Sequence, residues 1–448
     1  MTSTQFDSNR LVEQAAILVA AAKKAGADAA DAIVVRSQSL SIDVRLGKVE
    51  ESGRSESDDF SLRVFVGKSS ASISANSVGD PAQLAERAVA MARVSPENPF
   101  VGLADQDRLA GEFPDLDLMD DTVPGVEALE AAALECEEAA LSVAGITNSG
   151  GASASWGIGG MVLATSHGFE GQYIGSRFSR SISVVAGEGS SMERDYDYDS
   201  RVHYLDLENP SVIGKSAAER TLKRVGPRQV KTTSAPVIFD PRVSNSIVGH
   251  FASAINGASI ARKTSFLREK MGERIFSNGI RIEDDPCILR GQASHPFDGE
   301  GVQCEPLTLI DDGNLQCWLL DSATANELDL VTNGRAGRSG AGTSPGSTNL
   351  ALMAGEQSAS DMIASIDRGF YVTELIGQGV NMISGDYSRG ASGYWIENGE
   401  LAYPVSEITI AGNLTDMFAR LVPANDLVYR YRVNAPTLLV EDMTIAGT

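Results

Sequence analysis

Apolar and polar residues alternate along several stretches of the first two hundred residues. The segment 40–46 places Leu, Ile, Val and Leu at every second position, and the segment 60–66 repeats the pattern with Phe, Leu, Val and Val. Such alternation is typical of strands that bury one face. Residues 153–186 alternate on both sides of a predicted turn at 166–168, so they predict further antiparallel strands.

Helical periodicity marks other segments. Leu11, Ala15, Leu18 and Ala22 fall on one helical face. Asp80 followed by proline is typical of a helix N-cap and first turn. Further helices are predicted at 126–143, 212–225, 243–260 and near 358–366. The N-terminal order of helix, strands and helix predicts an α+β region whose sheet is covered by helices.

The C-terminal half carries more strand patterns and two similar hairpin signals. Residues 310–315 and 396–401 both read Ile, acid, Asx, Gly, any residue, Leu, and Asx-Gly favours a tight hairpin turn. These signals predict a β-rich domain that is barrel-like or sandwich-like. Between them, residues 332–348 are rich in Gly, Ser and Arg without any period, which predicts a long mobile loop.

The length of 448 residues indicates about three domain-sized units. We place them at 1–104 (N-terminal α+β domain), 105–230 (central α+β region) and 231–448 (C-terminal β-rich domain). The central region opens with an acidic segment, 105–121, which is interpreted as a solvated linker; cation binding is the alternative.

Charge and cysteine content narrow the class of protein. The net charge of −23 argues against a nucleic-acid partner, because phosphates would be repelled. The four cysteines show no C-x-x-C spacing and are typical of reduced thiols. The polar start of the chain predicts no targeting segment, and no apolar run approaches the length of a bilayer span. We therefore expect a cytoplasmic protein without a membrane partner.

The segment 377–414 packs glycines, an acid, a base and aromatic residues between two strand patterns. Together with Pro-Val-Ile-Phe-Asp-Pro at 236–241, Pro-Phe-Asp-Gly-Glu-Gly-Val at 296–302 and Met-Thr-Ile-Ala-Gly at 443–447, it resembles the TldD/PmbA peptidase family. The resemblance covers essentially the whole chain and is strongest to the PmbA (TldE) branch.

In the catalytic branch, the family carries a His-Glu-x-x-x-His helix and a later cysteine that together bind zinc, with the glutamate as general base. Here the corresponding helix keeps His250, but Phe251 replaces the base and Ile255 replaces the second ligand. No cysteine follows Cys317. The resemblance therefore implies that this chain has no catalytic residue, metal ligand set or cofactor of its own, and that zinc belongs to a partner subunit.

A single histidine on an apolar helix is usually a core or interface side chain with one hydrogen bond, which is our interpretation of His250. The other histidines, His167, His203 and His295, show no ligand spacing to one another. A metal site assembled from these distant residues is the alternative.

The resemblance implies a heterodimer with a metal-bearing TldD-type subunit that trims unfolded peptides, including peptide-antibiotic precursors and antitoxins. Homodimers are expected when the chain is alone. An extended peptide would bind by strand addition. Asp386 and Arg389 are placed near the peptide cavity, with an ion pair that fixes the loop beneath Trp395 as the alternative. The candidate peptide or partner contacts are Gly385, Asp386, Tyr387, Arg389 and Trp395.

Two other classes of function remain open from the sequence. A homodimeric binding or regulatory protein of the gyrase-modulator type would act without proteolysis of its own. A self-sufficient hydrolase is disfavoured, because no Gly-x-Ser-x-Gly elbow surrounds a candidate nucleophile.

Overall fold

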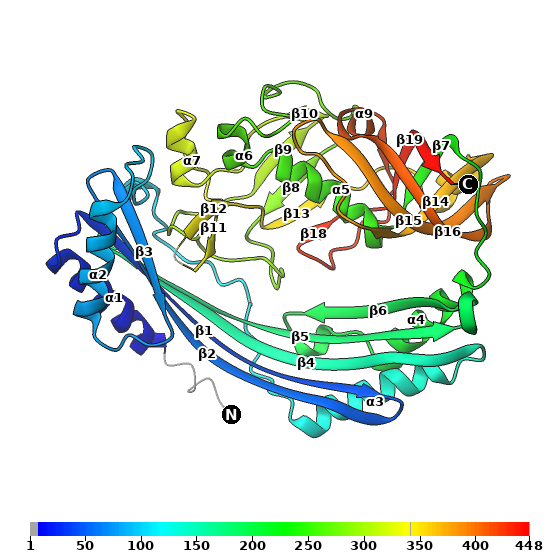
Figure 1. Cartoon of the computed structure of the whole chain (residues 1–448), viewed down its shortest axis with the longest axis horizontal. Helices are drawn as coiled ribbons and strands as arrows, with labels where there is room; N and C mark the ends of the chain where they lie inside the picture. The colour runs from blue at the N-terminus through cyan, green and yellow to red at the C-terminus, as the bar shows by residue number, and fades with distance from the viewer. Residues whose placement is uncertain (1–7, 341, 448) are drawn as a thin grey trace.

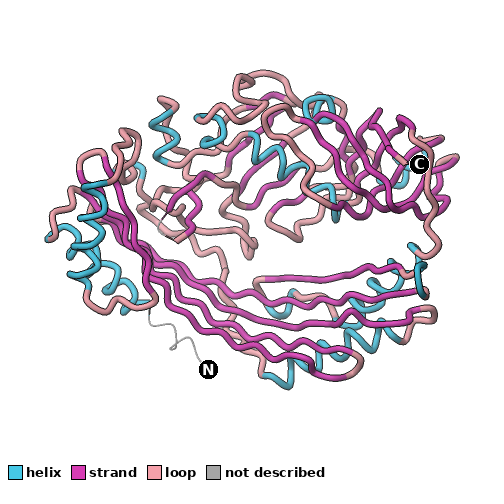
Figure 2. The backbone as a smooth tube through the Cα atoms, viewed as in Figure 1, coloured by secondary structure: helices cyan, strands magenta, loops and turns pink. Residues whose placement is uncertain are grey.

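The computed structural model describes residues 8–340 and 342–447, which form two lobes (Figure 1). The N-terminal lobe, residues 8–224, is a long sheet with helices on its outer face. The C-terminal lobe, residues 233–447, is rich in strands, and the sheet of the N-terminal lobe curves beneath it (Figure 2). This architecture confirms the predicted α+β class, with a helix-covered sheet followed by a β-rich region.

One antiparallel sheet with the order β3-β2-β1-β4-β5-β6 runs through the N-terminal lobe. It combines strands from both sides of residues 76–145, so the first two units predicted from the sequence share it. Its strands are β1 Ala29–Arg45, β2 Lys48–Val66, β3 Ser69–Ala75, β4 Ile146–Thr165, β5 Glu170–Ala186 and β6 Glu193–Arg201.

Four helices cover the two ends of the outer face of this sheet (Figure 1). They are α1 Ser8–Lys24, α2 Pro81–Val94, α3 Val126–Leu141 and α4 Pro210–Arg224. Even-numbered residues of β1 point to the helices: Val34 packs in the cluster of α1 and α2, and Ile42 in that of α3 and α4. Odd-numbered residues face the other way, and Ile33 packs with Phe297 of the C-terminal lobe. As predicted, Asp80 caps α2 by accepting hydrogen bonds from two backbone N–H groups.

The turn between β1 and β2 is held by a buried carboxylate of α3. Leu46 and Gly47 both adopt positive φ, at 50° and 74°. Their backbone N–H groups donate to the two carboxylate oxygens of Glu137, at 2.9 and 2.8 Å. Because Glu137 is only 1% exposed, water has little access to its carboxylate.

Replacing Glu137 by alanine is expected to lower the free energy of unfolding by about 1–3 kcal/mol, because two N–H groups lose a charged acceptor. Urea unfolding measures the loss. The neighbouring Glu138, which is exposed, provides the matched control, and its replacement by alanine should change stability by less than about 0.5 kcal/mol. Equal effects of the two replacements would contradict the assignment.

The C-terminal lobe contains a closed barrel of five strands, because β16 pairs with both β15 and β19. The strands are β7 Thr233–Phe239, β14 Arg368–Ile376, β15 Asp386–Glu397, β16 Glu400–Asn413 and β19 Leu438–Ala446, with β17 Leu421–Pro423 added on β19. The predicted Asn398-Gly399 hairpin joins β15 to β16, with positive φ at both residues.

A second sheet of the lobe has the order β10-β9-β8-β13-β18. It consists of β8 Ile282–Asp285, β9 Leu307–Asp311, β10 Asn314–Leu315, β13 Asn349–Leu352 and β18 Val433–Asn434. The helices of the lobe are α5 Pro241–Ala254, α6 Gly257–Ala261, α7 Ser322–Glu327, α8 Ala359–Ala364 and α9 Leu414–Ala419.

Two sequence predictions for this lobe are wrong. The helix predicted at 243–260 is broken between α5 and α6, where Asn256 accepts from the N–H of Ala258 and donates to the carbonyl of Pro345. The loop predicted at 332–348 contains a hairpin of β11 Ala336–Ser339 and β12 Gly342–Pro345. Its order comes from tertiary contacts that local sequence does not reveal.

The lobes contact each other at both ends of the long sheet. At the β3 end, Phe169 and Phe297 pack edge to face with ring centroids 5.2 Å apart. At the α4 end, Arg224 pairs with Glu374 of β14 at 2.5 Å, and Asp195 of β6 pairs with Arg242 at 2.8 Å. None of the helices in the described part of the chain has the length and apolar character needed to span a bilayer.

Candidate functional site

Helix α5 carries the residues that correspond to the metal motif discussed above. Asp240 caps the helix by accepting from the N–H of Arg242, and Pro241 occupies the first turn. The apolar face of α5 then enters the main core of the C-terminal lobe. Phe251 and Ile255 are both fully buried.

Phe251 is fixed among other aromatic rings. Its ring lies edge to face with those of Phe276 and Phe418, with centroids 5.4 and 6.2 Å away. Ile255 ends the helix as its C-cap residue and belongs to the same core cluster. These two positions therefore build the core and present no polar atom to any cavity.

His250 precedes Phe251 on α5 and is only partly buried. Its ring packs edge to face with Tyr387, with centroids 6.0 Å apart. Burial, and secondarily the positive charge of Arg389, lower the pKa of His250 to about 4. Nε2 of His250 is buried without a hydrogen-bond partner, so the hydrogen bond expected from the sequence is absent at this atom.

The low pKa of His250 predicts a specific pH dependence of stability. Between about pH 6.5 and pH 4 the unfolded chain binds a proton at this imidazole and the folded chain does not, so stability falls as pH falls through this window. At pH 5 the loss relative to pH 7 is expected to be about 2 kcal/mol larger than in a His250→Gln variant. Urea unfolding of both chains measures it.

Both chains share all other titrating groups, so the comparison cancels the contributions of those groups to the pH dependence of stability. One of them is Asp298, whose pKa burial raises to about 7 and whose contribution has the opposite sign. Parallel stability profiles of the wild-type and His250→Gln chains would contradict the burial of a neutral imidazole.

The candidate contact residues on and beside β15 differ in burial and in the side chains that surround them. Tyr387 is 1% exposed, its hydroxyl has no hydrogen-bond partner, and it lies beside His250. Burial raises the pKa of this phenol, while nearby Arg389 opposes the shift. Nε of Arg389 is likewise buried and unpaired. The structure thus brings His250, Tyr387 and Arg389 together.

Asp386, Gly385 and Trp395 lie apart from that group. Asp386 is exposed and accepts hydrogen bonds from Ser384 at 2.6 Å and from Asn413 at 3.2 Å. The alternative of an ion pair between Asp386 and Arg389 is therefore wrong. Gly385 precedes the strand with φ +81°, and Trp395 is buried in the core.

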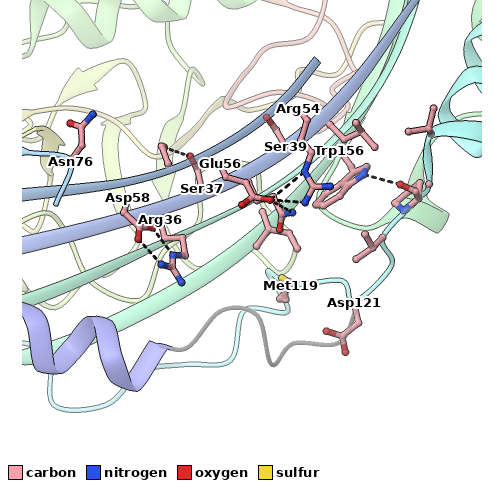
Figure 3. Close-up of a pocket in the computed structure, with 18 residues that line it drawn as sticks. Arg36, Ser37, Ser39, Arg54, Glu56, Asp58, Asn76, Met119, Asp121 and Trp156 are labelled. Carbon is pink, nitrogen blue, oxygen red and sulfur yellow. Dashed lines mark hydrogen bonds and ion pairs between the residues drawn. The ribbon is translucent and has the colours of Figure 1, made fainter. Parts of the chain in front are cut away.

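A first cavity, of about 690 Å³, lies between strands β1 and β2 and the segment before α3 (Figure 3). Arg36 forms two hydrogen bonds with the carboxylate of Asp58, at 2.6 and 2.5 Å. Arg54 pairs with Glu56 at 2.6 Å. Since its arginines are already paired with nearby carboxylates, this cavity offers little charge to a ligand.

A second cavity, of about 820 Å³, lies between the inner face of the sheet and the C-terminal lobe. Its described lining includes three arginines, Arg177, Arg338 and Arg432, and one carboxylate, Asp59. Sequence reasoning missed this site. Its one signal in the sequence is Arg338, which lies within the Gly-rich segment 332–348 that predicts a loop.

Comparisons with known proteins give matches along nearly the whole chain. Family models for PmbA/TldA metallopeptidases match in order: domain 1 at residues 30–92, the central domain at 121–225 and the C-terminal domain at 232–447. The Metalloprotease PmbA of Escherichia coli O157:H7 is 38% identical over 99% of this chain and 98% of its own length. The chain belongs to the PmbA/TldD metallopeptidase family.

Other members of the PmbA/TldD family agree with this placement. A PmbA homolog of Haemophilus influenzae is 35% identical over 95% of this chain and 94% of its own. The crystal structure of a protein described as a modulator of DNA gyrase, from Bacteroides thetaiotaomicron, superposes with a TM-score of 0.90 at 27% identity, covering 99% of both chains. TldE from Thermococcus kodakarensis has the same fold, with a TM-score of 0.84 at 21% identity over 97% of this chain and all of its own.

The metal implied by the PmbA/TldD family name does not fit the residues of this chain at the motif. Phe251 and Ile255 are fully buried in the core, so their positions offer neither a ligand nor a base. Within residues 8–340 and 342–447, no three His, Cys, Asp or Glu side chains are grouped so that they could hold a metal ion. We derive no catalytic step through a metal on this chain.

Proposed function

We propose that this chain is the non-catalytic subunit of a PmbA/TldD-type zinc metallopeptidase. It pairs with a metal-bearing TldD-type subunit and helps to hold unfolded peptides while that subunit cleaves them. The observation that carries the proposal is the complete burial of Phe251 and Ile255 among core side chains. A zinc-bound water needs imidazole or thiolate ligands and a nearby base, and apolar side chains supply neither.

The proposal includes the zinc of the partner, the heterodimer and the cytoplasmic location expected from the sequence. The substrates are unfolded peptides, including peptide-antibiotic precursors and antitoxins. The space between the lobes supports the role in holding peptide, because a cavity of about 820 Å³ opens between the inner face of the long sheet and the C-terminal lobe. Nucleic acid is not proposed as a partner, in view of the net charge of −23.

Reconstitution tests the proposal. The chain alone, a TldD-type subunit from the same source alone, and their mixture are assayed for cleavage of a labelled unfolded peptide, with zinc content measured in each sample. We expect cleavage only in the mixture, with zinc only in the TldD-type subunit. Because His250 is not a ligand in this proposal, a His250→Ala chain should reconstitute the same activity. Cleavage and one zinc per chain in this protein alone would overturn it.

A second function, a homodimeric binding or regulatory protein without proteolysis, is favoured by the B. thetaiotaomicron structure, which is described as a modulator of DNA gyrase. Affinity purification from cell extract separates the two functions. Co-purification with a TldD-type subunit supports the peptidase subunit. Self-dimers without that subunit support the regulatory protein.

A further inference from the structure

We propose that the cavity between the lobes binds a carboxylate of the peptide, either its free C-terminus or an acidic side chain, through Arg338, Arg177 and Arg432. This inference rests on the proposed function, because it names the part of the peptide that this chain holds. These three residues form the arginine cluster.

Arg338 is the buried member of the arginine cluster. Its side chain is 6% exposed, and Nη2 donates to Oδ1 of Asp31 at 2.6 Å. Nε and Nη1 of the same guanidinium are buried and have no hydrogen-bond partner. An arginine remains charged in a protein, and leaving its buried donors unpaired is costly. Arg338 therefore faces the cavity with unused capacity to bind an acceptor.

The charge of Asp31 does not neutralise the cavity, because this carboxylate is shared. Its other oxygen, Oδ2, accepts from Nη2 of Arg63 at 2.5 Å and from Nε of Arg63 at 3.0 Å. Both arginines hold the pKa of Asp31 below its usual value despite burial, which by itself raises that pKa. Asp31 is thus shared by two guanidinium groups, of which Arg63 also lies 3.9 Å from a carboxylate oxygen of Glu300.

Arg177 and Arg432 are the exposed members of the arginine cluster. Nη2 of Arg177 donates to the carbonyl of Gln292 at 3.0 Å, and Nη2 of Arg432 donates to the carbonyl of Ser347. Neither forms an ion pair with a carboxylate in the described part of the chain. These backbone contacts orient both guanidinium groups along the cavity and leave their charge available.

The local charge is opposite to that of the whole protein. Three arginines face one lining carboxylate, Asp59, in a chain with a net charge of −23. An extended polyanion would be repelled by the surrounding surface, whereas a single carboxylate fits inside the cavity. A carboxylate also matches the planar guanidinium, which can donate two parallel N–H bonds to it.

The rest of the lining suits a peptide backbone. Gly159, Gly160 and Gly337 contribute no side chains, so a main chain can approach the sheet closely. Tyr173 and His295 stack at 6.2 Å and form an aromatic wall. Burial lowers the pKa of His295, so at neutral pH the arginines supply the positive charge.

Fluorescence anisotropy with four labelled peptides of about ten residues tests the proposal on the full-length chain. The peptides have the same sequence and combine a free or amidated C-terminus with aspartate or asparagine at internal positions. We expect the peptide with both carboxylates to bind at least about tenfold more tightly than the peptide with neither, and binding to weaken as salt rises. If amidation causes the loss, the C-terminus is the ligand. If the aspartate-to-asparagine change causes the loss of affinity, the acidic side chain is the ligand.

Three variants of the arginine cluster and one control variant locate the binding site. Arg177→Gln and Arg432→Gln remove exposed charges, and each should weaken binding of the carboxylate peptide about three- to tenfold. Arg87→Gln, an equally exposed change on α2 at the outer face, should leave binding unchanged. Arg338→Gln should abolish the preference for carboxylate, with circular dichroism as the check that the chain has folded.

Equal binding of all four peptides, or equal affinities of the Arg177→Gln, Arg432→Gln and Arg87→Gln chains, would overturn the inference. Reconstituted cleavage by the same preparations is measured separately. If reconstituted cleavage persists but peptides bind without a preference for carboxylate, only the proposed role of the arginine cluster is contradicted. If no cleavage is reconstituted, the proposed function is contradicted.

Discussion

A chain carrying Phe251→Glu is expected to lose more than about 4 kcal/mol of unfolding free energy, and added zinc should not restore it. The change reinstates the glutamate of the family's metal motif, but the position is fully buried against Phe276 and Phe418. Removing a buried phenylalanine alone costs about 3–5 kcal/mol. A carboxylate there also loses its hydration without gaining a partner.

Urea unfolding with and without zinc measures this effect. Phe251→Leu is the matched control, because it keeps the site apolar, and it should lose less than half as much stability. The control separates the loss of ring packing from the burial of charge. A Phe251→Glu chain as stable as Phe251→Leu, or one stabilised by zinc, would show that this part of α5 is open to solvent or metal.

The second large effect is expected for Arg335→Met. The Arg335 side chain is fully buried, and Nε donates to Oδ2 of the equally buried Asp284 at 2.5 Å. Its other nitrogens donate to backbone carbonyls, including that of Glu305 at 2.6 Å. Removing the cation leaves an uncompensated buried carboxylate, which costs about 3–5 kcal/mol.

Arg281→Met is the matched control for this prediction, because Arg281 also pairs with carboxylates but lies at the surface. Its loss should be below about 1 kcal/mol. Adding Asp284→Asn to Arg335→Met should recover part of the stability, since the amide carries no charge and its oxygen still accepts from Thr348. Similar losses for Arg335→Met and Arg281→Met would contradict the structure. Thermal or urea unfolding is sufficient for all three chains.

Local sequence patterns predicted the elements that bury one face. The Asp80 cap of α2, the 166–168 turn and the Asn398-Gly399 hairpin are all present. The full length of β2 was not predicted, because most residues between Lys48 and Asp59 are polar and exposed on both faces. Their strand conformation comes from pairing with β1, and pairing leaves no period in the sequence.

The sequence predicts those features of the candidate site that follow from the type of a single residue, and not those that depend on contacts between distant residues. The sequence showed that Phe251 and Ile255 cannot bind metal, since this follows from residue type. It did not show that Arg338 meets Asp31, because these residues lie far apart in the chain and meet through the packing of two lobes. The same limit explains Arg335, whose glycine-rich neighbours indicate a loop, whereas its buried partner Asp284 lies on β8, far away in the sequence.

The contacts at the two ends of the long sheet differ in how the chain constrains them. Residues 225–232 join the lobes beside the ion pairs of Arg224 and Arg242, so these groups remain at high effective concentration even when their contacts break. Phe169 and Phe297 have no such short tether. At this end the aromatic contact and the ion pair of Arg338 with Asp31, which lie 307 positions apart, both close long loops between the lobes. Loss of both would favour separation of the β3 end of the sheet while the α4 end stayed attached.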